Sequence, residues 1–125
     1  MKFTEEFYKC IANLFYAVSM ADKNMTVEEK RSIVKRVEIN WSTSENKSDS
    51  ELIYETIRGL IKEKITSEEA YENFKAYYLA HKKEFSKKVI HDLLAASHEI
   101  SDAYAGKNKS ELIILSKLHK LLKLA

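Results

Sequence analysis

The residues best suited to bind a ligand lie in the stretch from Ala21 to Glu29, where one apolar segment ends and another begins. Four side chains with carboxylate or amide oxygens gather there, namely Asp22, Asn24, Glu28 and Glu29. Carboxylate and amide oxygens are the ligands that Ca²⁺ and Mg²⁺ prefer in proteins. The sequence therefore predicts a candidate site for a divalent cation at this corner.

The same carboxylates also have a purely structural interpretation. Thr26 followed three residues later by Glu29 is a capping box, in which both side chains satisfy free N–H groups at a helix start. The helix dipole favours negative charge at that end. The order Asp-x-Asn-x-Thr is typical of the start of an EF-hand loop, but Val27 and Ile33 stand where that loop needs glycine and glutamate. Plain helix capping is therefore the alternative to cation binding.

A second corner of similar composition lies between Ala105 and Glu111. Pairing residues 21–26 with 105–110 aligns Ala21 with Ala105, Asn24 with Asn108 and Thr26 with Ser110. A register shifted by two residues aligns Glu29 with Glu111, Leu14 with Ala96 and Val18 with Ile100. A duplicated helical hairpin explains both alignments, and the sequence leaves its register open.

The elements that position these corners are predicted to be helices. The chain has 125 residues, no proline and only two glycines, which disfavours a turn-rich β fold. Its 45% hydrophobic and 32% charged residues are typical of a soluble globular domain. We therefore predict an all-α fold, with residues 1–125 forming a single domain as a compact bundle of six to seven helices.

Apolar residues at the i, i+3, i+4, i+7 spacing place these helices along the chain. We expect helices at about 4–21, 26–39, 48–61 (or from 50), 66–81, 85–105 (or from 86) and from the Ser110 cap into the tail. Thr4 is the expected cap of the first helix, and Thr66 with Glu69 forms another capping box. The polar stretch 40–50 is expected to be a surface loop, with Trp41 folding back onto the core.

The segment from Leu14 to Glu29 resembles the signature of the TerB-like family, which includes tellurite-resistance proteins. The shared pattern is an apolar helix, an acidic corner and a glutamate-rich helix start, echoed in the second half. The resemblance implies an all-α, non-enzymatic protein with divalent cations at its acidic corners. It adds Asp102 and Glu111 to the four candidate ligands of the first corner. Lys23 and Gly106 depart from the pattern, standing where the family has glycine and an acidic residue. A stress-response role is one implication, although tellurite resistance itself does not follow.

Other functional classes find little support in the sequence. The single cysteine, Cys10, lies in an apolar stripe, which is typical of a core residue, and no nucleophile or phosphate-binding motif is present. A net charge of +2 predicts no nucleic-acid binding. No apolar run is long enough for a membrane span, so we expect a cytoplasmic protein. His98 and Asp102 form a possible i, i+4 contact, while His81 and His119 have no partner in sequence.

Two functions are compatible with these observations. The first is a non-enzymatic binding module that contacts partner proteins and holds a divalent cation, with no other cofactor. The alternative is a structural domain that self-associates without metal, through the leucine-rich last helix and the aromatic fourth helix.

Overall fold

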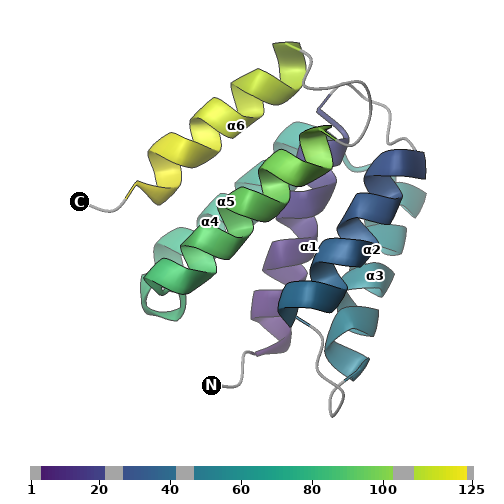
Figure 1. Ribbon diagram of the computed structural model, residues 1–125, viewed down its shortest axis with the longest axis horizontal. Coiled ribbons are helices and arrows are strands. Elements are labelled where there is room, and N and C mark those ends of the chain that lie inside the picture. Colours follow the sequence, from purple (N-terminus) through teal and green to yellow (C-terminus); the bar gives the residue numbers. More distant parts are fainter. Residues whose placement is uncertain (1–3, 22–26, 42–46, 103–108, 124–125) are drawn as a thin grey trace.

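The computed structural model describes residues 4–21, 27–41, 47–102 and 109–123, which form helices and, within these ranges, no strand (Figure 1). The helices are α1 (Glu5–Ser19), α2 (Val27–Trp41), α3 (Lys47–Lys62), α4 (Ser67–Ala80), α5 (Lys87–Asp102) and α6 (Lys109–Leu122), with a short 3₁₀ helix, η1 (Lys82–Glu84), after α4. The predicted all-α bundle of six to seven helices is confirmed.

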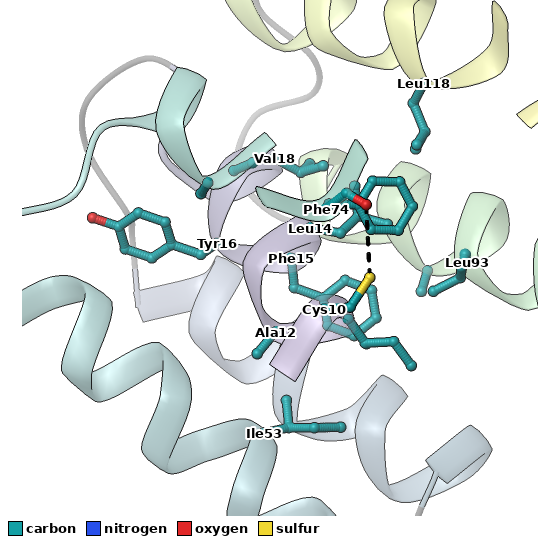
Figure 2. Close-up of a cluster of buried hydrophobic side chains, with 14 of the residues drawn as sticks. Cys10, Ala12, Leu14, Phe15, Tyr16, Val18, Ile53, Phe74, Leu93 and Leu118 are labelled. Atoms are coloured by element: carbon teal, nitrogen blue, oxygen red, sulfur yellow. Dashed lines mark hydrogen bonds between the residues drawn. The ribbon is translucent and has the colours of Figure 1, made fainter. Parts of the chain in front are cut away.

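The first helix, α1, forms the centre of the bundle. Its residues are buried almost all round, as expected for a helix that is apolar on every side. It packs most extensively against α4 and α3, and then against α5. Figure 2 shows side chains of these three helices around it, with Ile53 from α3, Phe74 from α4 and Leu93 from α5. The other helices are therefore positioned relative to α1.

Aromatic residues of α4 form part of this core. Phe74 is fully buried, and its ring centroid lies 6.5 Å from that of Tyr71, 6.3 Å from Tyr78 and 6.2 Å from Phe85. Stacked and edge-to-face pairs at such distances stabilise a core beyond the area they bury. Tyr71, Phe74 and Tyr78 of α4 therefore belong to the core.

Two of the predicted helix caps, Thr4 and Thr66, are confirmed. The Phe7 N–H donates to Thr4 Oγ1 at 3.1 Å, and the Glu69 N–H donates to Thr66 Oγ1 at 3.1 Å. Ser110 is not the cap of the last helix, because α6 already begins at Lys109. A serine also suits the first turn, so its type alone could not fix the boundary. The Thr26 cap lies outside the described residues.

The predicted surface loop at 40–50 is shorter than expected. Helix α2 continues to Trp41, and α3 already begins at Lys47. Serine and aspartate are common both in loops and in the first turn of a helix, and here they occupy the first turn of α3. The predicted packing of the Trp41 side chain lies outside what the structure describes.

The pattern of burial favours one of the two registers for the repeat. In the register that pairs Glu29 with Glu111, every buried position of α5 falls on a buried position of α1. The pairs are Phe7/Val89, Tyr8/Ile90, Ile11/Leu93, Leu14/Ala96, Phe15/Ser97, Val18/Ile100 and Ser19/Ser101. The likeness weakens later in the second helix of each pair, where buried Val37 falls on exposed His119. The shifted register is therefore the better description of the predicted duplication.

A buried tyrosine ties α1 to the turn between α3 and α4. The Tyr16 hydroxyl donates to the Ile65 carbonyl at 2.6 Å, and its side chain is almost fully buried. Burial raises the pKa of Tyr16, and the negative charge of Glu69 raises it further, so the hydroxyl stays a donor at neutral pH.

Tyr16→Phe is expected to lower the free energy of unfolding by about 1–2 kcal/mol, because the partly buried Ile65 carbonyl loses this donor. Urea titration followed by circular dichroism measures the change. Tyr54→Phe is the matched control, because its hydroxyl donates to the Val34 carbonyl at 3.3 Å in an exposed place. Equal losses in both variants would show that the Tyr16 hydrogen bond contributes no more to stability than the exposed Tyr54 bond.

Candidate functional site

The parts of the chain that flank the two corners lie at the same end of the bundle. Figure 1 shows the last turns of α1 and α5 and the first turns of α2 and α6 together at this end. Ala21, at the start of the first corner, and Ser110, near the end of the second, line one pocket. The arrangement that the predicted site requires is therefore present in the described flanks of the corners.

This pocket has a volume of about 330 Å³ and lies between the first turns of α4 and α6. Its lining is mixed and comprises Ala21, Ser67, Glu68, Tyr71, Glu72, Ser110, Ile113, Ile114 and Lys117. The Ser67 hydroxyl donates to the Ala17 carbonyl at 2.7 Å, which fixes the start of α4 against α1. The pocket is thus built on well-packed elements, with carboxylates on α4 and an ammonium group on α6.

The predicted ligands occupy different environments. Glu29 and Glu111 are buried, with exposed fractions of 3% and 2%, and each is the third residue of its helix. Glu28 and Asp102 are exposed, while Asp22 and Asn24 lie outside the described residues. A carboxylate in the first turn is stabilised by the N–H groups and the dipole of its helix. Burial of Glu29 and Glu111 therefore agrees with capping as well as with cation binding.

No group of three or more histidine, cysteine, aspartate or glutamate side chains within the described ranges is arranged to hold a metal ion. The four described candidates therefore do not form a complete site by themselves. A site at this end would need Asp22 or Asn24 in addition, as the sequence analysis expected. The cation site stays a prediction.

A second concave surface, which sequence reasoning missed, lies between α2 and α3. This groove has a volume of about 370 Å³ and is lined by Lys30, Ile33, Val34, Tyr54, Ile57, Arg58 and Ile61. Ile33 and Ile57 are buried in its floor, whereas Val34 and Ile61 are each 41% exposed on its walls. The two cationic side chains, Lys30 and Arg58, are exposed. We call this surface the α2–α3 groove.

Charged side chains connect α2 to α5. Both Nε and Nη2 of Arg36 donate to Glu99 Oε2 on α5, with 2.6 Å between Nε and the oxygen. Lys35 adds a longer contact to the other oxygen at 3.9 Å. Charge-assisted bonds of this kind restrict both helices. One wall of the α2–α3 groove is therefore anchored to α5.

The only cysteine belongs to the core, as predicted. Cys10 is buried, and its thiol lies 3.9 Å from the Phe74 carbonyl (Figure 2). Burial raises the pKa of this thiol far above its usual range, and the charge of Glu84 adds to the effect. Cys10 is therefore not poised to act as a nucleophile or a metal ligand.

Cys10 is expected to resist alkylation by iodoacetamide at pH 8 in the folded protein and to react at the rate of a free thiol in 6 M guanidinium. The protected rate then follows global unfolding, because only unfolding exposes the sulfur. Mass spectrometry of timed samples measures both rates. Rapid labelling without denaturant would contradict the buried position.

Comparison with known proteins adds no relative. No family model matches the chain, and neither curated proteins nor solved structures show a significant similarity. The TerB-like resemblance thus rests on residues 14–29 and on the order of the helices. Within the described residues, no helix has both the length and the apolar character needed to cross a bilayer.

Proposed function

We propose that this chain is a non-enzymatic, cytoplasmic protein-binding module of TerB-like type. Its α2–α3 groove accepts an apolar helical segment of a partner protein that carries carboxylates beside its apolar residues. The observation that supports this most is the exposure of Val34 and Ile61 on the walls of an apolar groove. Exposed apolar residues gathered in one concavity are typical of protein-interaction sites.

The shape and charge of the groove favour a helical segment with acidic flanks. Two antiparallel-paired helices leave a channel into which side chains at i, i+3, i+4 and i+7 of a third helix can insert. Lys30 and Arg58 are exposed beside the apolar floor, where they attract carboxylates of the partner. Apart from Lys30, Arg58 and the Tyr54 hydroxyl, the lining is apolar, so it offers few polar groups for orienting a small polar substrate. A protein partner is therefore the better occupant.

Photo-crosslinking in the source cells tests this proposal. A photoreactive residue at position 34 is expected to give one dominant adduct, and the same residue at the exposed position 79 on α4 is the control. The crosslinked partner peptide is expected to show helical apolar periodicity with flanking Asp or Glu. Adducts of equal yield and identity from both positions would contradict the assignment of the α2–α3 groove.

A divalent cation at the two corners is the second part of the proposal. It is supported by the burial of Glu29 and Glu111 at matching positions and by the TerB-like resemblance. Calorimetric titration with Ca²⁺ and Mg²⁺ tests it, with Asp22→Ala combined with Glu29→Ala as the variant. Heat in the native chain that the variant loses would support the site, whereas no heat would leave only helix capping.

Self-association through α6 is the competing function. Leu112 and Ile113 are adjacent on this helix and are 53% and 51% exposed, so they offer an apolar surface to a second copy. Light scattering at high protein concentration distinguishes the two. A dimeric mass that Ile113→Glu restores to a monomer would favour self-association over the α2–α3 groove.

A further inference from the structure

Two histidines that are distant in the sequence meet between α5 and α6. His98 Nε2 and His119 Nε2 lie 2.6 Å apart, and the ring centroids are separated by 4.9 Å at an interplanar angle of 61°. The rings therefore point their Nε2 atoms at one another. His119 is exposed and His98 is partly exposed, so solvent has access to the pair.

We propose that His98 and His119 bind a divalent transition-metal ion, Zn²⁺ or Cu²⁺, through their Nε2 atoms. Imidazole nitrogen is a preferred ligand of both ions. Two nitrogens that share a tetrahedral Zn²⁺ at about 2.0–2.1 Å lie roughly 3.3 Å apart, so the rings need to separate by less than about 1 Å. Small side-chain rotations at this accessible position supply that movement.

Metal binding requires one proton to move within the histidine pair. In the hydrogen-bonded pair one Nε2 carries a proton and the other accepts it. When the ion binds, that proton moves to Nδ1 of the same ring through solvent, so both imidazoles stay neutral and each Nε2 offers its lone pair. Binding releases no net proton when both rings start neutral.

The neighbourhood determines which ions the pair selects. The described residues bring no third histidine, cysteine or carboxylate into a shared ligand group, so water completes the coordination shell. Glu99, next to His98, is already held by Arg36 and Lys35. Lys120, which follows His119 on α6, is exposed and disfavours a doubly charged ion at long range. Binding should therefore follow imidazole affinity, with Cu²⁺ above Zn²⁺ and no response to Ca²⁺ or Mg²⁺.

Binding at this place would fasten the last helix to the bundle. Helix α6 packs mainly against α5, with fewer contacts to α1. An ion that bridges His98 and His119 binds only when the two helices are packed, so it stabilises that arrangement. Its effect is therefore expected to be concentrated in α6.

Equilibrium dialysis of the full chain against ZnCl₂ tests the proposal. One equivalent of Zn²⁺ is expected to bind the native chain, and His98→Gln and His119→Gln are each expected to weaken binding at least roughly tenfold. His91→Gln is the matched control, because His91 lies on the exposed side of α5 and its substitution should leave binding unchanged. Circular dichroism confirms that each variant is folded.

Two further measurements report on the place of binding and on the ligand atoms. Zn²⁺ is expected to slow hydrogen exchange in α6 of the native chain and not in His119→Gln, and the Cu²⁺ electron paramagnetic resonance spectrum is expected to show coupling to two nitrogens. The proposal is overturned if the native chain binds no Zn²⁺. It is equally overturned if either glutamine variant binds as tightly as the native chain, or if His91→Gln weakens binding as much as they do.

Discussion

Replacing Phe74 with alanine is expected to lower the free energy of unfolding by about 3–5 kcal/mol. The fully buried ring makes contacts with Tyr71, Tyr78 and Phe85, and it lies where α4 packs on the central helix α1. Truncation removes these contacts and leaves a cavity that a tightly packed core fills only in part. Single domains have a total free energy of unfolding of about 5–15 kcal/mol, so this substitution removes a large part of it.

Thermal unfolding followed by circular dichroism measures this effect, and the midpoint is expected to fall by roughly 10–20 °C. Leu79→Ala is the matched control on the same helix, because Leu79 is half exposed and should change stability by less than about 0.5 kcal/mol. Phe74→Leu, which keeps most of the volume, should lie between the two. A small loss for Phe74→Ala would mean that α4 does not pack on α1 as described.

The combined variant Val34→Glu and Ile61→Glu is expected to weaken binding of the crosslinked partner segment by at least roughly 30-fold. Both side chains line the walls of the α2–α3 groove and are partly exposed in the free protein. A carboxylate there competes with the partner's carboxylates for Lys30 and Arg58, and it loses its water when the apolar face of the partner covers it. Fluorescence anisotropy with a labelled synthetic copy of the segment measures the loss.

The free protein itself should tolerate these changes. Each substituted residue is 41% exposed, so the free energy of unfolding should fall by no more than about 1 kcal/mol. Leu79→Glu provides the control for added negative charge away from the groove. Unchanged affinity in the combined variant would place the partner elsewhere on the molecule.

Local patterns were enough to predict most of the fold. The absence of proline and the spacing of apolar residues identified the six helices, and cap residues such as Thr4 and Thr66 identified two of their starts. These signals depend on residues within one or two turns of a helix, so they can be recognised without knowing how distant parts of the chain pack. Boundaries were less certain at Ser110 and around residues 40–50, where serine suits a loop, a cap and a first turn equally well.

The candidate sites were harder to predict because they depend on contacts between distant helices. The α2–α3 groove requires the pairing of two helices, and neither Val34 nor Ile61 differs in sequence from an ordinary core residue. The ion pair of Arg36 with Glu99 was equally hard to predict, because the two residues lie on different helices. The same holds for His98 and His119, which meet only once α6 packs on α5. The repeat alone left open whether the two corners meet, and the ligand geometry of Asp22 and Asn24 lies outside the described residues.

A charge-swap experiment on the α2–α3 groove tests the central proposal most directly. The double reversal Lys30→Glu and Arg58→Glu changes the exposed cationic side chains and leaves the apolar floor intact. We expect the reversal to weaken binding of the labelled partner segment at least roughly tenfold. Affinity should return when the carboxylates of that segment are replaced by lysine. Equal affinity of the native and reversed proteins for the acidic segment would contradict the proposed mode of binding.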